Sequence, residues 1–180
     1  MRQARSPLLL PGLAIAAVVI LVDQIVKAIV LDYLGSGQRA VEVTSFFNLV
    51  LVWNRGVSFG LFAEDADAVR WALTALALGI AAVLAVWLAR TDRAVLGVSL
   101  GLIIGGAIGN AIDRIRFGAV ADFLDVHLAG YHWPAFNVAD SAITVGVVTM
   151  LADSLFGRHG RPQADVADGR PAGRSGDGAS

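Results

Sequence analysis

Two aspartates, Asp122 and Asp140, are the residues of this sequence best suited to chemistry. The chain contains no cysteine and only three histidines without metal-ligand spacing, so thiol nucleophiles, disulfides and thiolate metal sites are excluded. Ser141 is an alternative nucleophile, but no histidine or lysine partner for it is evident. Two carboxylates in a partly dry site share one proton, so the ionised one can take a proton from water while the protonated one polarises a carbonyl. The sequence therefore favours aspartic-protease chemistry, with no metal and no cofactor.

Several other polar residues fall within stretches that are otherwise apolar. Ionisable side chains in such stretches are costly and by default indicate a functional site. Asp23 and Lys27 are four residues apart and share one helix face, which also permits the plain alternative of a self-neutralising ion pair. Gly105 and Gly109 form a small-residue face for close helix packing. Three more polar residues crowd the end of the same segment: Asn110, Asp113 and Arg114.

The elements that must position these residues are four apolar stretches. Hydrophobic residues make up 56% of the 180 residues and charged residues only 16%, and the mean hydropathy is +0.67. A soluble domain has roughly 25% charged residues, so this composition indicates an integral membrane protein. Each stretch approaches the roughly 20 residues that a spanning helix needs. We predict an all-α membrane protein with four transmembrane helices, the first retained and not cleaved, over residues 8–31, 69–89, 94–112 and 134–156.

The basic residues predict how the chain crosses the membrane. The short turn over residues 90–93 carries two arginines, and positive charges in short loops stay cytoplasmic, so we expect both termini inside. Residues 38–62 have the pattern of short strands around a turn, which predicts a small extracytoplasmic β-rich segment between spans one and two. Residues 1–157 then form the membrane domain, and the polar residues 158–180 a disordered cytoplasmic tail. The net charge of −1 offers no basic patch for nucleic acid.

The polar residues converge at one depth. With a helical rise of about 1.5 Å per residue, Asp23 lies about 20 Å along the first span and Asn110 about 24 Å along the third, counted from the cytoplasm. Asp140 enters from outside and lies about 9 Å, or two turns, into the fourth span. Asn54 and Asp122 come from the external segments at the same level. The sequence thus predicts one site in the outer third of the bilayer.

At these residues the sequence resembles the lipoprotein signal peptidase (signal peptidase II) family, which are membrane aspartic proteases. Five segments in the family's order carry the resemblance: residues 23–27, 54–60, 105–114, 120–123 and 136–141. The resemblance implies that Asp122 and Asp140 are the catalytic pair. It also implies a set of residues that line the substrate cleft or support it: Asp23, Lys27, Asn54, Gly56, Asn110, Arg114, Asn137 and Ala139. Ser58 departs from the alanine that is more usual in the family.

The resemblance implies a protease of the bacterial inner membrane. The family cleaves prolipoproteins just before a cysteine that carries diacylglycerol, at the outer leaflet. We therefore expect diacylglyceryl-modified prolipoproteins and membrane lipid as partners, no nucleic acid, and a monomer. Two alternatives use the same residues. A proton-coupled transporter would place its site near the midplane between repeats, which this chain lacks, and a plain helical bundle would use the polar residues for packing.

Overall fold

The computed structural model describes residues 6–35, 37, 40–56 and 66–156. Within these ranges there are four long helices, α1 (Leu9–Gly35), α2 (Ala66–Leu88), α3 (Ala94–Phe117) and α4 (Val138–Phe156). All four are long and apolar enough to cross a membrane, which confirms the four predicted apolar helices. The predicted tail, residues 158–180, lies outside the described residues.

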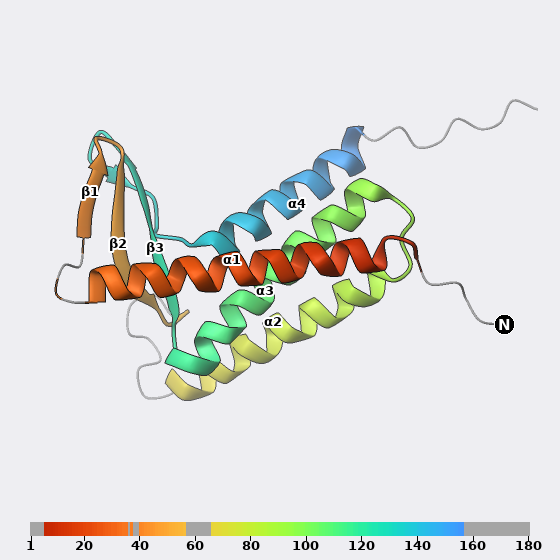
Figure 1. Ribbon diagram of the computed structural model, residues 1–180, viewed down its shortest axis with the longest axis horizontal. Coiled ribbons are helices and arrows are strands. Elements are labelled where there is room, and N and C mark those ends of the chain that lie inside the picture. Colours follow the sequence, from red (N-terminus) through yellow and green to blue (C-terminus); the bar gives the residue numbers. More distant parts are fainter. Residues whose placement is uncertain (1–5, 36, 38–39, 57–65, 157–180) are drawn as a thin grey trace, which may run out of the picture.

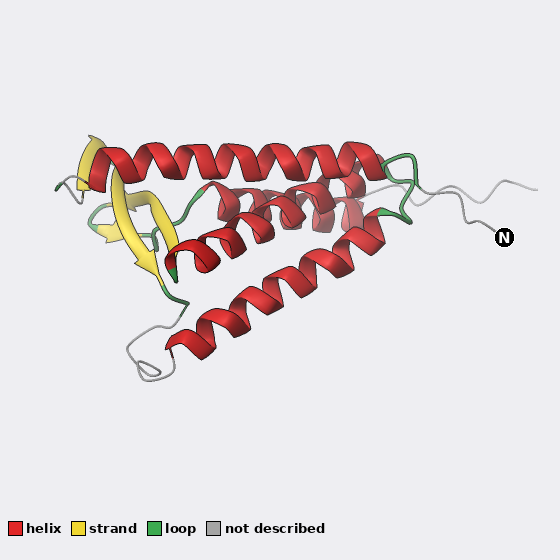
Figure 2. Cartoon of the chain, turned by 60° about the horizontal axis from the view of Figure 1, so that its bottom comes forward, coloured by secondary structure: helices red, strands yellow, loops and turns green. Residues whose placement is uncertain are grey.

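A four-stranded antiparallel sheet caps one end of the helices (Figures 1 and 2). Its strands are β1 (Ala40–Thr44), β2 (Phe47–Asn54), β3 (Val120–Leu128) and β4 (Tyr131–His132), paired in that order. The prediction of strands between the first two helices is confirmed but was incomplete, because β3 and β4 come from the connection between α3 and α4. A hairpin alone is at best marginally stable in water, and the second connection supplies the further strands that complete a sheet.

Two helix boundaries differ from the prediction in ways that affect the site. α3 continues to Phe117, five residues beyond the predicted end, and stops at Gly118, which has the left-handed φ of 77° typical of a helix C-cap. α4 begins at Val138 and not at 134, because Phe136 is extended and pairs with Leu124 of β3. Asp140 therefore lies in the first turn of α4, not two turns into the helix.

α3 is the central helix of the bundle. It packs against α1, α2 and α4, and it is the most deeply buried of the four. Beneath the sheet, Val30 and Leu34 of α1 pack with Phe123 of β3 in a small second core. The described chain begins and ends at the opposite end of the bundle from the sheet (Figure 1). The end that carries the sheet is called the sheet end below.

Glycines let α3 approach its neighbours closely. A Cβ atom at Gly105 would lie 2.7 Å from Val19 Cβ and 2.8 Å from the carbonyl oxygen of Ala16, both on α1. A Cβ at Gly109 would lie 2.9 Å from Oδ2 of Asp23. The predicted small-residue face is confirmed, and it brings the α3 backbone against the polar residues of α1.

Gly105→Ala should lower the thermal unfolding temperature in detergent, because its Cβ meets backbone on α1 that must shift. Overpacking of this kind costs about 1–3 kcal/mol. The matched control is Gly79→Ala, also within a helix, where an added Cβ meets nothing within 4 Å. That control should unfold at the wild-type temperature or above it, because alanine favours helix over glycine. Equal unfolding temperatures for the two variants would contradict the close α1–α3 packing.

Candidate active site

A buried ion triplet, defined as Lys27 with Asp23 and Asp113, lies toward the sheet end of the bundle. Nζ of Lys27 is 2.8 Å from Oδ2 of Asp23 and 2.7 Å from Oδ2 of Asp113. All three residues are at most 2% exposed. Buried charges are tolerated when they are paired and hydrogen-bonded. The Asp23–Lys27 contact predicted from spacing is therefore present, and Asp113 of α3 is a second partner.

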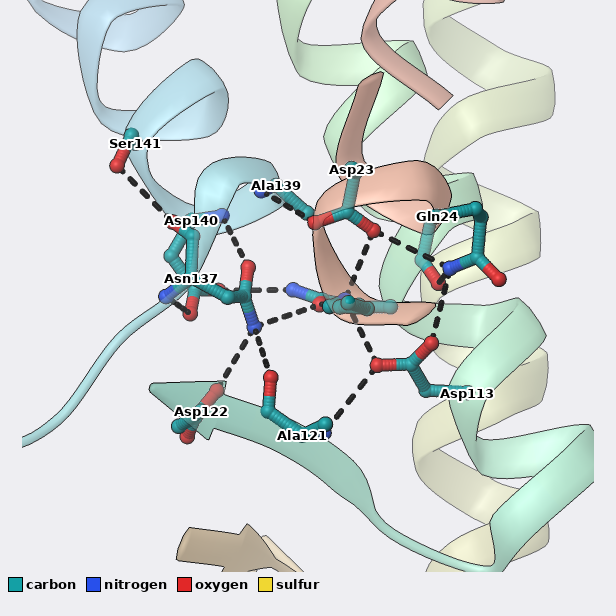
Figure 3. A network of polar contacts seen from close by, with 12 residues as sticks. Asp23, Gln24, Asp113, Ala121, Asp122, Asn137, Ala139, Asp140 and Ser141 are labelled. Atoms are coloured by element: carbon teal, nitrogen blue, oxygen red, sulfur yellow. Dashed lines mark hydrogen bonds and ion pairs between the residues drawn. The ribbon is translucent and has the colours of Figure 1, made fainter. Parts of the chain in front are cut away.

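The ion triplet also holds the backbone of two other segments (Figure 3). Oδ1 of Asp23 accepts a hydrogen bond from the N–H of Ala139 at 2.9 Å. Oδ2 of Asp113 accepts one from the N–H of Ala121 at 3.2 Å. These two alanines directly precede Asp140 and Asp122. The triplet thereby fixes the start of α4 and the start of β3 relative to α1 and α3.

Asn137 joins the two aspartates. Its Nδ2 donates to Oδ1 of Asp122 at 2.7 Å. Its Oδ1 accepts the N–H of Asp140 at 2.9 Å, and its own N–H donates to Oδ2 of Asp140 at 3.2 Å. This reciprocal arrangement is a capping box at the start of α4, in which the cap and the third helical residue satisfy each other's backbone. The local sequence that begins the helix therefore also sets the rotamer of Asp140.

Two further asparagines complete the contacts of the aspartates. Nδ2 of Asn54, at the end of β2, donates to Oδ2 of Asp122 at 3.0 Å. Nδ2 of Asn110, on α3, donates to Oδ1 of Asp140 at 2.8 Å. Oδ1 of Asn110 in turn accepts from Nζ of Lys27 at 3.3 Å. Each aspartate thus receives amide hydrogen bonds, and Asn110 links the ion triplet to Asp140.

The environment of Asp122 favours its protonated form. Burial of the side chain raises its pKa to about 6, because desolvation disfavours the charged carboxylate. Hydrogen bonds from Asn54 and Asn137 oppose the rise, and the negative charge of Asp140 adds to it. A carboxyl whose pKa is raised to about 6 by burial and by a second carboxyl can gain and lose a proton readily, which suits general acid–base chemistry.

The remaining predicted site residues have distinct places. Gly56 has a φ of 79°, which favours glycine, and its N–H donates to Oδ1 of Asn54 at 2.9 Å. Arg114 donates through Nη1 to the carbonyl oxygen of Asn110 at 3.4 Å, and its buried Nε has no partner among the described residues. Ala139 is fully buried. Ser58 lies outside the described residues.

Sequence reasoning assigned no role to two residues of the network. Asp113 was noted only as one of several polar residues at the end of α3, and Gln24 only as part of a motif. Gln24 Nε2 donates to Oδ1 of Asp113 at 2.9 Å and to Oδ2 of Asp23 at 3.2 Å, so it bridges the two carboxylates. Gln24 lies within the motif 23–27, so the sequence could have indicated it as a site residue. Its contact with Asp113 on α3 is visible only in the tertiary structure. Ser141 donates to the carbonyl oxygen of Asn137 at 2.9 Å and lacks a basic partner among the described residues.

The fold and the site define a multi-pass membrane protein with a buried carboxylate–amide cluster at one end of a helical bundle. In the described residues no group of histidine, cysteine, aspartate and glutamate is arranged to hold a metal ion. A family model for Signal peptidase (SPase) II matches residues 15–156. The chain belongs to the signal peptidase II family, which makes it a membrane protease.

Two curated relatives carry the name of this family, and one solved membrane enzyme shares the fold. The chain is 49% identical over 151 residues to the lipoprotein signal peptidase of Burkholderia vietnamiensis, across 83% of this chain and 90% of that protein. It is 48% identical over 151 residues to that of Burkholderia multivorans, with the same coverage. A bacterial membrane enzyme solved by the in meso method at 1.9 Å superposes with a TM-score of 0.70 at 27% identity, over 82% of this chain and 94% of the other.

Lys27→Ala should destabilise the fold strongly while leaving residual turnover. Removing one partner leaves two buried carboxylates facing each other, and breaking a buried pair in this way costs about 3–5 kcal/mol. The matched control is Arg93→Ala, which breaks the more exposed pair with Asp153 at the other end of the bundle. That variant should unfold within about 1 kcal/mol of wild type. A fully stable Lys27→Ala protein without turnover would place Lys27 in the chemistry instead.

The raised pKa of Asp122 predicts a pH-dependent stability. An unfolded aspartate titrates near pH 3.9, so the fold binds this proton more tightly than the unfolded chain. The stabilisation by Asp122 is then fully present below about pH 4 and is lost as pH rises through about 6. Between about pH 4 and pH 7, wild type should therefore lose stability relative to Asp122→Asn. If the unfolding temperatures of wild type and Asp122→Asn differ by the same amount at every pH in this range, the shifted pKa is contradicted.

Proposed function

We propose that the chain is a lipoprotein signal peptidase of aspartic type, which cleaves diacylglyceryl-modified prolipoproteins immediately before the lipidated cysteine. The observation that carries this proposal is the position of Asp122 and Asp140. Asp122 lies on β3 and Asp140 on α4, with only β4 between these elements, and one buried asparagine, Asn137, bonds to both. The family match and the lipoprotein signal peptidases among the relatives support the substrate class.

In the proposed mechanism the two aspartates share one proton. The ionised carboxylate accepts a proton from a water molecule as the water oxygen attacks the scissile carbonyl carbon. The protonated carboxyl donates to the carbonyl oxygen, so a neutral tetrahedral diol forms. The aspartate that took the proton from water then gives a proton to the amide nitrogen, while the other aspartate, now ionised, takes one from a diol hydroxyl. The C–N bond breaks, the signal peptide leaves with a new carboxyl group, the lipidated cysteine becomes a new N-terminal amine, and the pair again holds one proton. The amides of Asn54 and Asn110 hold the two carboxyls in place during these transfers.

We place the site toward the outer leaflet of the bacterial inner membrane, with the sheet extracytoplasmic and both termini cytoplasmic. The described chain begins and ends at the end of the bundle opposite the sheet. The turn with Arg90 and Arg93 joins α2 to α3 at that same end, which favours a cytoplasmic location for it. Residues 1–157 form the peptidase domain in this proposal, and the protein acts as a monomer.

The asparagine variants Asp122→Asn and Asp140→Asn should each reduce cleavage to below a few per cent of wild type. An amide cannot exchange the shared proton, although its shape is close to that of a carboxylic acid. The measurement is a gel-shift assay of a diacylglyceryl-modified prolipoprotein with purified variants. Asp153→Asn, at the far end of α4 in a pair with Arg93, is the matched control and should retain activity. Appreciable mature product from either site variant would reject the catalytic pair.

Lipidation of the substrate should matter strongly. The acyl chains remain among lipid, and they hold the scissile bond at the depth of the aspartates. An unlipidated precursor of identical sequence should therefore be cleaved at least about 100-fold less efficiently, which corresponds to about 2.7 kcal/mol of transition-state stabilisation. Equal rates on both precursors in one detergent would show that depth does not select the bond. Proton-coupled uptake by liposomes without any peptide cleavage would instead support the transporter alternative.

A further inference from the structure

Strand β3, which carries Asp122, lies between two neighbours that supply amides to that aspartate. On one side is β2, which ends with Asn54. On the other side the chain turns after β3 and runs back along it over residues 131–137, called the return segment below, which ends with Asn137. The hydrogen bonds of Asp122 therefore depend on how both neighbours are aligned with β3.

The register of β2 against β3 shifts before β2 reaches the site. Between Leu49 and Val52, two residues of β2 oppose the single residue Phe123 of β3. This is a β-bulge, in which the extra residue locally disrupts the ladder of backbone hydrogen bonds. Side chains of a strand alternate between its two faces, so a further shift by one residue would turn Asn54 away from Asp122.

The return segment carries a second irregularity on the other side of β3. His132 and Phe136 are four positions apart, but their partners on β3, His127 and Leu124, are three positions apart. The return segment therefore also has one extra residue. Pro134 lies within this stretch and has no N–H to donate to β3. On both sides of β3 the backbone pairing is thus disturbed before it reaches the site.

Asp125 of β3 bonds to both neighbours beside these irregularities. Its Oδ2 accepts a hydrogen bond from Nδ2 of Asn48, its direct partner on β2, at 2.9 Å. Both of its oxygens lie 2.9 Å from Nδ1 of His132 in the return segment, and an ionised carboxylate only accepts, so Nδ1 is the donor. Asp125 is 8% exposed. Its side chain therefore joins three segments of the sheet in a nearly buried place.

The contacts of Asp125 are of the stronger kind. The hydrogen bonds from His132 and then from Asn48 hold the pKa of Asp125 below its usual range, so the carboxyl is ionised at neutral pH. Hydrogen bonds to an ionised group are roughly twice as strong as those between neutral groups. The ring of His132 also stacks on that of His127, with the ring centroids 4.7 Å apart. These contacts fix the alignment of both neighbours where the backbone ladder does not.

We propose that Asp125 is a positioning residue for the cleavage reaction, which fixes the register of β2 and of the return segment and so holds Asn54 and Asn137 at Asp122. It acts through these two amides and not through contact with the substrate. Its effect on turnover rests on the proposed function, whereas its effect on the amide of Asn54 is measurable without any substrate.

The first test compares Asp125→Leu with Asp125→Asn in the cleavage of a synthetic diacylglyceryl-modified prolipoprotein peptide. Leucine accepts no hydrogen bond, so kcat should fall by about tenfold or more, within the range that misplaced groups cost, while KM changes by less than about twofold. Asparagine keeps an acceptor for His132, and its Nδ2 can donate to Asn48 once that amide has flipped, so kcat should stay within about threefold of wild type. Glu42→Leu is the matched control, because Glu42 is exposed and lies opposite Asn48 on β1.

Each kinetic outcome supports or overturns the inference. Equal losses for Asp125→Leu and Asp125→Asn would show that the charge matters and not the hydrogen bonds. Equal losses for Asp125→Leu and Glu42→Leu would show that the sheet responds to any apolar substitution. A higher KM with unchanged kcat would place Asp125 in substrate binding. Each of these results overturns the proposal, as does wild-type turnover in Asp125→Leu.

A second measurement needs neither substrate nor a folded Asp125→Leu protein. The chain has only four asparagines, so ¹⁵N-asparagine labelling gives a simple NMR spectrum of the side-chain amides in detergent. The signal of Asn54 is assigned by its loss in Asn54→Ser. Asn48→Leu breaks the contact with β2 and should shift this signal, whereas His132→Phe breaks only the contact with the return segment and should leave it in place.

An Asn54 signal that stays at the wild-type position in Asn48→Leu would overturn the inference. A signal that shifts equally in Asn48→Leu and His132→Phe would also overturn it, because the two contacts would then not act on separate neighbours. A wild-type protein that cleaves no lipidated peptide would refute the proposed function, while the Asn54 signal would still decide whether Asp125 sets the contacts of Asp122.

Discussion

Lys27 lies between two buried carboxylates from different helices, and the rest of the site depends on this contact. A lysine ammonium has three donors, and here they reach Asp23, Asp113 and Asn110. The two carboxylates in turn hold the backbone of two other segments, because they accept hydrogen bonds from the N–H groups of Ala139 and Ala121. One side chain on α1 thereby sets the relative positions of β3 and α4. The residue that follows each of these alanines is one of the two candidate catalytic aspartates.

This network requires close helix packing. Asp23 reaches α4 past α3 at a point where Gly109 leaves room, since a Cβ there would lie 2.9 Å from the carboxylate. Removing that space would displace a charge that has nowhere else to be solvated in a membrane. Helix packing and site geometry are therefore coupled: what holds α1, α3 and α4 together also holds the carboxyls.

The asparagine side chains and the ion triplet hold different parts of the site. The triplet satisfies its own charges and holds backbone, whereas Asn54, Asn110 and Asn137 contact the aspartate side chains directly. Burial raises the pKa of Asp122 to about 6, and the hydrogen bonds from Asn54 and Asn137 and the charge of Lys27 offset this rise only in part. A carboxyl pair can share a proton when its members are not each paired directly with a cation.

The sequence alone determined the four apolar helices, the glycine face of α3 and the Asp23–Lys27 pair, because hydropathy and helical spacing act over a few residues. It also contained every motif of the candidate site, since the family resemblance resides in short segments. It did not determine the start of α4 at Val138, because the preceding residues are apolar and only their pairing with β3 makes them extended. Nor did it show that β3 completes the sheet or that Asp113 is the second partner of Lys27. Those contacts join residues more than 60 positions apart, and only tertiary packing brings them within hydrogen-bonding distance.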